Sequence, residues 1–226
     1  MNNASSARGV IFDVDGVLVA SGPAHRASWR TVARKAGLEM PDDLFLHSFG
    51  MPSRDIIRRV WGEGLSDARV REVDDEKEKV YRELVRGMLP LTIGVREMLH
   101  GLRDAGLVLS VATSGPPENL ELVIREGRLT GWFAATVHGF DVERGKPAPD
   151  CFLLAAQRAG LRPSGCVVVE DAPAGIAAAR AAQMPVIGFV GTHSAERLRE
   201  AGVSAVVERL TEVTPALVDG LLAGRE

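Results

Sequence analysis

The hydrophobic positions divide the chain into two kinds of segment. Residues 10–12 form a short, continuous apolar run, which is typical of a strand buried in a parallel sheet. From Leu91 onward, similar runs alternate with stretches in which apolar residues recur every three to four positions. These patterns predict strands at 107–113, 134–137, 166–170, 185–190 and 203–207, and helices at 94–103, 119–128, 149–159 and 175–182.

The segment between the first two strands has helical spacing throughout. Three helices are expected there, beginning near His25, after Ser53 and near Ala68. In the third of them, charged residues lie opposite an apolar stripe, and we expect these charges to form a solvent-exposed face. The stretch 21–23 interrupts the pattern and contains a proline suited to the first turn of a helix, so it is expected to act as a hinge.

The order of these elements predicts the fold class. Strands that alternate with helices form βαβ units, and right-handed crossovers place their strands in one parallel sheet. We therefore expect an α/β protein, a three-layer sandwich with a parallel Rossmann-like sheet and an inserted all-helical cap domain. The predicted core comprises residues 1–20 and 89–226, and the predicted cap comprises residues 21–88.

Composition limits the classes of partner. The 226 residues are 46% hydrophobic and carry a formal net charge of -3, so the surface as a whole does not attract nucleic acid or an anionic membrane. No apolar run approaches the ~20 residues of a membrane span, and the first residues lack the apolar segment of a signal peptide. We expect a cytoplasmic protein without nucleic-acid or membrane partners, and we favour a monomer. Cys151 and Cys166 lack the spacing of a zinc site and are expected to be buried thiols.

Polar residues that suit phosphate chemistry follow the predicted strands. In an open parallel sheet, ligands bind beyond the carboxyl ends of the strands, so these residues are expected to meet in one crevice. Carboxylates there can hold Mg²⁺, a lysine can neutralise phosphate oxygens, and hydroxyl and amide groups can bind the remaining oxygens. The residues are Asp13, Asp15, Thr113, Ser114, Gly115, Lys146, Glu170 and Asp171.

Four of these residues also have a simpler interpretation when taken alone. Thr113 could merely end a strand, and Lys146 could be an ordinary surface lysine. Glu170 and Asp171 could cap the following helix. Their predicted meeting at one sheet edge favours the functional interpretation.

Four segments together resemble a known family. FDVDG at 12–16, the strand end at Thr113 and Ser114, GKPAPD at 145–150 and VVVEDAPAG at 167–175 resemble, in order, the four motifs of the haloacid dehalogenase-like hydrolases. The helical insertion resembles the type 1 cap of the branch that includes β-phosphoglucomutase and phosphoglycolate phosphatase. The resemblance spans nearly the whole predicted core.

The resemblance implies a role for each motif residue. Asp13 is expected to be the nucleophile that forms an aspartyl-phosphate, and Asp15 the general acid/base. To protonate a leaving alkoxide near neutral pH, Asp15 would need a pKa above the ~3.9 of an ordinary aspartate. Thr113 would hydrogen-bond the phosphoryl group, and Lys146 would offset charge on the nucleophile and the phosphate.

The same resemblance implies a magnesium site and a phosphate-binding loop. Asp171 would bind Mg²⁺ beside Asp13 and the backbone carbonyl of Asp15, with Glu170 as a ligand or as a partner that orients the ligands. The other expected substrate-binding residues of the core are Gly16, Ser114 and Gly115.

Two residues of the helical segment are candidates for reading the substrate. His25 and Arg54 fall where β-phosphoglucomutase-like proteins have a histidine and an arginine that serve the acid/base group and the distal phosphate. Alternatively, His25 could only pack beside Trp29, and Arg54 could be a surface arginine at the start of a helix.

Two departures from the mutase pattern favour hydrolysis. Many relatives have an aspartate where this chain has Ala20, and the stretch 113–119, TSGPPEN, lacks the lysine of the mutase pattern. The predicted function is therefore a Mg²⁺-dependent phosphatase acting on a small phosphorylated metabolite, a sugar, polyol or glycolate phosphate. A phosphomutase is the alternative, and a non-enzymatic phosphate- or Mg²⁺-binding protein is a distant one.

Overall fold

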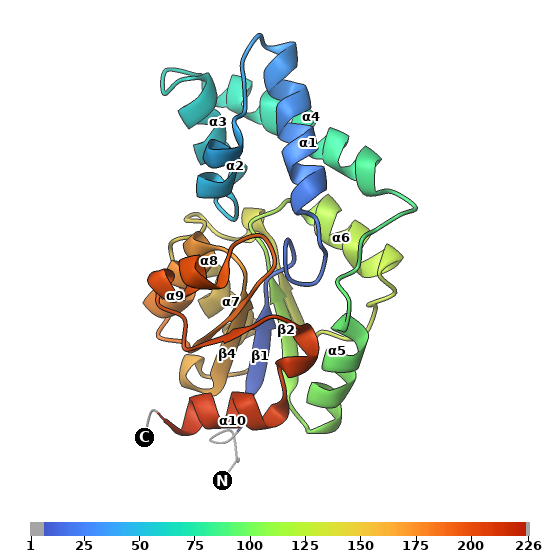
Figure 1. The fold of residues 1–226 in the computed structure, drawn as a ribbon, viewed down its shortest axis with the longest axis vertical. Helices are drawn as coiled ribbons and strands as arrows, with labels where there is room; N and C mark the ends of the chain where they lie inside the picture. Colours follow the sequence, from blue (N-terminus) through green and yellow to red (C-terminus); the bar gives the residue numbers. More distant parts are fainter. Residues whose placement is uncertain (1–6, 225–226) are drawn as a thin grey trace.

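The computed structural model describes residues 7–224, which form a six-stranded parallel sheet flanked by helices (Figure 1). The strands are β1 (Gly9–Phe12), β2 (Val108–Ala112), β3 (Ala135–Val137), β4 (Cys166–Glu170), β5 (Val186–Phe189) and β6 (Ala205–Val207). Their spatial order is β3-β2-β1-β4-β5-β6, and all neighbouring pairs are parallel. The order reverses between β1 and β4, so a Rossmann-like sheet of this kind opens its ligand crevice there.

Side chains alternate between the two faces of the sheet, and each face is covered by helices. On β1, Val10 and Phe12 belong to one apolar cluster, together with residues of α5 (Val95–Asp104), α6 (Pro117–Glu126) and α10 (Pro215–Ala223). Ile11 belongs to the opposite cluster, with α7 (Asp150–Arg158), α8 (Pro173–Ala181) and α9 (Ala195–Ala201). These three layers confirm the predicted α/β sandwich.

Four further helices follow β1 and pack together above the sheet (Figure 1). They are α1 (Gly22–Lys35), α2 (Asp42–Ser48), α3 (Ser53–Trp61) and α4 (Asp67–Val85), and we call them the cap. They bury an apolar cluster of their own that includes Trp29, Phe45 and Ile57. Pro23 lies in the first turn of α1, as the sequence predicts. The sheet and its flanking helices are called the core.

The hydrophobic periodicity of the sequence does not predict three of the helices in the structure, namely α2, α9 and α10. Both α2 and α9 have seven residues, about two turns, so each presents few apolar positions to a periodic pattern. The helix α10 is the third, with only Val218 fully buried. The last strand begins at Ala205, two residues later than predicted.

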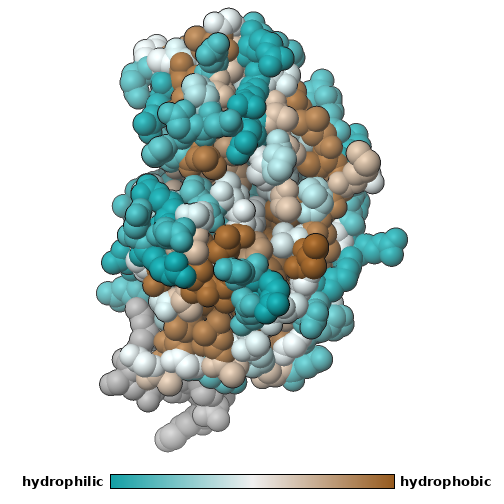
Figure 2. Space-filling view, viewed as in Figure 1, coloured by the Kyte–Doolittle hydropathy of each residue, from teal (hydrophilic) through white to brown (hydrophobic). Residues whose placement is uncertain are grey.

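On the face shown in Figure 2, hydrophilic residues cover much of the cap, and hydrophobic residues gather between α9 and α10 of the core. Within residues 7–224, no helix is both long and apolar enough to cross a membrane. The two cysteines are buried and unpaired, as predicted.

Candidate active site

The carboxylate of Asp13 lies at the carboxyl end of β1 and is paired with Lys146. The backbone N–H of Asp13 donates to the carbonyl of Val169, so the ladder between β1 and β4 fixes its position. The ammonium of Lys146 donates to Asp13 Oδ1 at 2.6 Å and to Glu170 Oε1 at 2.7 Å, with a longer contact to the carbonyl of Ala112 at 3.4 Å. An ammonium has three N–H groups, so this fully buried lysine has a partner for each.

Glu170 is fixed by its neighbours on both carboxylate oxygens. Its Oε2 accepts the backbone N–H groups of Asp171 and Ala172, each at 2.9 Å, while Oε1 accepts from Lys146. A side chain at Gly175 would place its Cβ 1.6 Å from Glu170 Oε1, so only glycine lets α8 approach this carboxylate. Of the two expected roles, orienting the neighbouring groups suits this geometry better than ligating a metal.

Asp171 presents one free oxygen to the same volume. Its Oδ2 accepts the backbone N–H of Thr192 at 2.9 Å, whereas its Oδ1 is buried without a hydrogen-bond partner. A buried carboxylate oxygen without a partner is costly unless a cation or donor satisfies it. Ligand atoms of Asp13, Glu170 and Asp171 lie within 4.8 Å of one another. The donor set is all oxygen, which fits Mg²⁺.

The charges of the three carboxylates Asp13, Glu170 and Asp171 also favour binding of a cation. Burial raises the pKa of Asp13 to about 8, and repulsion from Glu170 and Asp15 adds to it, although Lys146 acts in the opposite direction. Burial likewise raises the pKa of Asp171 well above its usual value, with repulsion from Glu170 and Asp13 as further causes. One lysine does not balance these carboxylates, and a divalent cation among them would favour their ionised forms.

Asp15 turns away from this group and toward the cap. Its Oδ1 accepts hydrogen bonds from Ser21 Oγ at 2.7 Å, from His25 Nε2 at 2.9 Å and, at 3.4 Å, from Tyr81 OH. The imidazole of His25 stacks on the Tyr81 ring, with centroids 3.9 Å apart and planes 5° apart. Three side chains, two at the start of α1 and one on α4, thus fix the rotamer of Asp15. The alternative interpretation, in which His25 only packs beside Trp29, does not account for its hydrogen bond to Asp15.

Lys77 determines which nitrogen of His25 carries the proton. Lys77 Nζ lies 2.9 Å from His25 Nδ1 and 2.7 Å from Glu78 Oε1. An ammonium can only donate, so Nδ1 accepts and the N–H of the ring is on Nε2, facing Asp15. Burial alone would raise the pKa of Glu78, but the charge and the hydrogen bond of Lys77 hold that pKa below its usual value. Glu78 is therefore an anion that holds Lys77 in place.

The surroundings of Asp15 correct one expectation from the sequence. Burial alone would raise the pKa of Asp15, as expected for a general acid. The hydrogen bonds of His25 and Ser21 and the charge of Lys77 outweigh burial, and they hold the pKa of Asp15 below its usual range. The resting site therefore holds Asp15 ionised.

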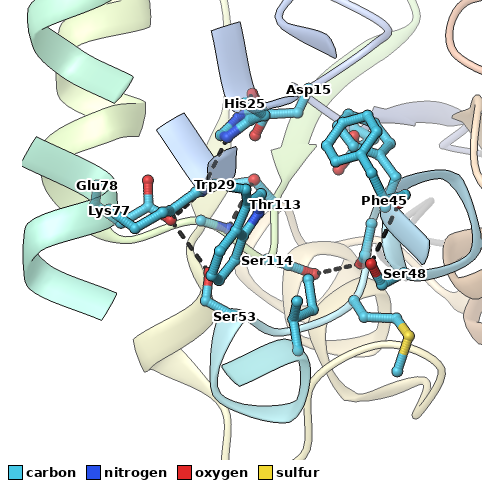
Figure 3. A pocket seen from close by; sticks show the side chains of 16 residues that line it. Asp15, His25, Trp29, Phe45, Ser48, Ser53, Lys77, Glu78, Thr113 and Ser114 are labelled. Carbon is cyan, nitrogen blue, oxygen red and sulfur yellow. Dashed lines mark hydrogen bonds and ion pairs between the residues drawn. The ribbon is translucent and has the colours of Figure 1, made fainter. Parts of the chain in front are cut away.

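A small cavity of about 50 Å³ joins Asp13 and Asp15 to the cap. Figure 3 shows Lys77 and Glu78 reaching into it from α4, with bonds to His25 and Ser53. Thr113, Ser114 and Gly115 line its core side, as predicted. Its cap side is mostly apolar and is formed by Trp29, Phe45, Phe49, Met51 and Ile56, with Ser48 and Ser53.

A family model described as haloacid dehalogenase-like hydrolase matches residues 7–183, more than three quarters of the chain. The chain belongs to the haloacid dehalogenase-like hydrolases. The match includes all the strand-end residues described above except the loop that carries Thr192.

Proteins related to this haloacid dehalogenase-like chain include two phosphatases of Escherichia coli strain K12. Hexitol phosphatase A is 34% identical over 209 residues, which cover 92% of this chain and 93% of that protein. The fructose-1-phosphate phosphatase YqaB is 35% identical over 182 residues, covering 79% and 94%. The chain is therefore an enzyme of this family and, like both relatives, a phosphatase. A β-phosphoglucomutase structure from Clostridium difficile matches the fold with a TM-score of 0.85 at 20% identity, covering 96% and 98%.

Three of the family positions expected to bind substrate have other partners in this structure. Ser114 Oγ donates to the carbonyl of Gly50 in the cap at 3.0 Å. Arg54 is half exposed, donates to the carbonyl of Glu143 at 2.8 Å and does not line the cavity with Asp13 and Asp15. Gly16 has a φ of +86°, and a Cβ there would lie 1.9 Å from Asp171 Oδ2, so it makes room for that carboxylate. Substrate contacts by these residues stay a prediction.

The sequence interpretation missed Lys77 and Glu78. It assigned the charges of α4 to a solvent-exposed face, but both side chains are buried. Lys77 lies four residues from both Val73 and Tyr81, so it falls on the buried stripe of the helix. A lysine between two apolar residues of one stripe is the signal that could have identified it.

Proposed function

We propose that this protein is a Mg²⁺-dependent phosphatase that hydrolyses a small phosphomonoester through an aspartyl-phosphate on Asp13. The observation that carries the proposal is the buried group in which Lys146 pairs with Asp13 and Glu170 beside the unpartnered Oδ1 of Asp171. Asp15 stands two residues after the nucleophile, on the side of the cap. This arrangement supplies a nucleophile, a charge-neutralising lysine, a cation site and a separate proton carrier.

In the first step, Asp13 attacks phosphorus and the substrate oxygen leaves with a proton from Asp15. The entering phosphate is anionic and lies beside Asp15, so it raises the pKa of that carboxyl and favours the protonated form. In the second step, Asp15 takes a proton from the attacking water, and the phosphate leaves Asp13. The contacts with Ser21 and His25 hold Asp15 in one rotamer for both steps.

Three residues are proposed to hold the cation and the phosphate. Asp13 and Asp171 would hold Mg²⁺, and Glu170 would orient both through Lys146 and the backbone of Asp171. The cation supplies charge neutralisation for the phosphate oxygens. Thr113 Oγ1 accepts the N–H of Gly115 at 3.0 Å. Its own hydroxyl hydrogen can therefore turn toward a phosphate oxygen.

The cavity supports a substrate with a small organic part and one phosphate. The space of about 50 Å³ leaves little room for a large group while the cap is closed. Its cap side offers Lys77 as a cation, but Lys77 is engaged by His25 and Glu78. Arg54 lines a neighbouring space with Thr113 and Ser114, where it donates to the carbonyl of Glu143. A second phosphate in the cavity with Asp13 and Asp15 would lack a free cation, which favours a phosphatase over a mutase and favours sugar, polyol or glycolate phosphates. Action in the cytoplasm as a monomer stays a prediction.

A panel assay tests the proposal. Phosphate release is measured with hexitol, hexose, glycerol and glycolate phosphates in the presence of Mg²⁺ or excess EDTA. β-Glucose 1-phosphate is included with a glucose 6-phosphate readout. We expect Mg²⁺-dependent phosphate release from at least one sugar or polyol phosphate. Formation of glucose 6-phosphate without phosphate release would indicate a mutase instead, and full activity in EDTA would contradict the cation site.

A further inference from the structure

The loop between β5 and α9 wraps around the carboxylate of Asp171. The backbone N–H of Thr192 donates to Asp171 Oδ2 at 2.9 Å. At Gly191, a Cβ would lie 2.2 Å from the carbonyl oxygen of Gly16 and 3.1 Å from Asp171 Oδ2. The loop therefore has no free space on this side, and its position determines where the unpartnered Oδ1 of Asp171 points.

His193, the next residue of this loop, bridges the core and the cap. Its Nδ1 lies 3.0 Å from the carbonyl oxygen of Asp171, and its Nε2 lies 2.9 Å from the carbonyl oxygen of Leu46 in α2. Carbonyl oxygens only accept, so a ring nitrogen of His193 that carries a proton can donate to the carbonyl it faces. The ring is buried, with its centroid 6.5 Å from that of Phe49, which lines the cavity. One side chain thus lies within hydrogen-bond distance of both the backbone of Asp171 and the cap.

The cap end of this bridge is a helix terminus. Leu46 lies in the last turn of α2, where backbone carbonyls have no partner within the helix. Figure 1 shows α2 facing α8 and the loop that leads to α9. Close by, a Cβ at Gly50 would lie 2.8 Å from Cβ of Ala172, the residue after Asp171. The C-terminal part of α2 and the turn after it therefore dock beside the cation site.

We infer that His193 is a positioning residue that couples closure of the cap to cation binding at Asp171. When α2 moves away from the core, Nε2 loses the carbonyl of Leu46, and the loop loses its attachment to the cap. The carboxylate of Asp171 is then less firmly oriented. Because coupling between two equilibria is reciprocal, closure strengthens cation binding and a bound cation favours closure by the same factor.

This inference rests on the magnesium site of the proposed function, but its test needs no turnover. Mg²⁺ affinity is measured by calorimetry without substrate. The position of the cap is measured from the distance between spin labels at Glu63→Cys on the exposed part of the cap and Glu200→Cys on α9, because the native thiols are buried. In the otherwise unmodified protein, Mg²⁺ alone is expected to shift the distances toward the closed form.

One variant removes the contacts of His193, and a second variant serves as its control. His193→Phe keeps an aromatic ring beside Phe49 but removes both ring nitrogens. We expect its Mg²⁺ affinity to fall by about fivefold or more, the lower end of typical coupling factors, and we expect Mg²⁺ no longer to change the label distances. Arg54→Ala is the matched control, because it removes a cap-to-core hydrogen bond to Glu143 that does not involve Asp171. This control should open the cap more often while keeping the Mg²⁺-induced shift.

The outcomes separate this inference from the proposed function. If His193→Phe shows the same Mg²⁺ affinity and the same Mg²⁺-induced shift as the parent, the inference is wrong and the proposed function stands. If the parent binds no Mg²⁺, both are wrong. Should His193→Phe not fold by circular dichroism, His193→Gln replaces it, since one amide nitrogen cannot reach both carbonyls, and the same losses are expected.

Discussion

Lys77 Nζ lies 2.9 Å from Nδ1 of His25, and this contact leaves the ring proton on the nitrogen that faces Asp15. The proposed acid/base group is thus held by a chain of contacts from α4. Glu78 extends the chain into the core, because its Oε2 accepts from Nδ2 of Asn119 at 2.7 Å. Asp15 has its full set of cap partners only when the cap and the core are in contact.

The first prediction concerns the pH dependence of His25→Phe, which keeps an aromatic ring beside Tyr81 and removes the hydrogen bond to Asp15. That hydrogen bond lowers the pKa of Asp15, so the substitution raises that pKa. A general acid acts in its protonated form, so the basic limb of the kcat/KM profile should move to higher pH. The maximal rate should fall by less than the roughly 10²–10⁴-fold contributed by general acid–base catalysis. An unshifted limb would mean that His25 does not influence Asp15.

The second prediction concerns the stability of Lys77→Met. Removing this buried cation leaves Glu78 as an unpaired buried anion, and breaking such a pair costs about 3–5 kcal/mol. Urea unfolding should show a loss of this size. Lys35→Met is the matched control, because its ion pair with Glu76 is exposed and such pairs contribute about 0–1 kcal/mol. Equal losses in both variants would contradict the assignment of Glu78 as a buried anion.

The third prediction separates Asp15 from the cation site. The side chain of Asp15 bonds to Ser21 and to His25 of the cap, whereas Asp171 presents an unpartnered oxygen among the core carboxylates. Asp171→Ala should therefore abolish Mg²⁺ binding in calorimetry, while Asp15→Asn should bind Mg²⁺ nearly as the parent does and lose turnover. A similar loss of Mg²⁺ affinity in both variants would contradict this division of roles.

The fourth prediction concerns substrate choice by Arg54. In this structure, its guanidinium bonds to the backbone of Glu143 and lines a space beside the cavity that holds Asp13 and Asp15. Arg54→Ala should therefore change kcat/KM by a similar factor for a phosphorylated sugar acid and for a simple polyol phosphate. A selective loss of roughly 1.5–3 kcal/mol for the doubly anionic substrate, the contribution of a charge-assisted hydrogen bond, would instead show that Arg54 reads a second anionic group.

The core residues of the site could be predicted because strand ends are visible in the sequence. Asp13, Thr113 and Glu170 each follow an apolar run, and parallel strands bring such ends to one edge. The motifs then add Lys146, whose loop carries no periodic signal of its own.

The cap contacts could not be predicted in the same way. His193 bonds only to backbone carbonyls, so no partner side chain in the sequence indicates its role. The lowered pKa of Asp15 depends on its distances to Ser21 and His25 at the start of α1 and to Lys77 on α4. The sequence pattern does not show that these two segments meet at Asp15.

The central claim is that Asp13 is the nucleophile of a Mg²⁺-dependent phosphatase. The most direct measurement is phosphate release from a hexitol or hexose phosphate by the parent and by Asp13→Asn, both with Mg²⁺ and both checked for an unchanged fold by circular dichroism. An amide is a poor nucleophile, so release by the parent and none by Asp13→Asn is the predicted result. Release by Asp13→Asn at the rate of the parent would contradict the account.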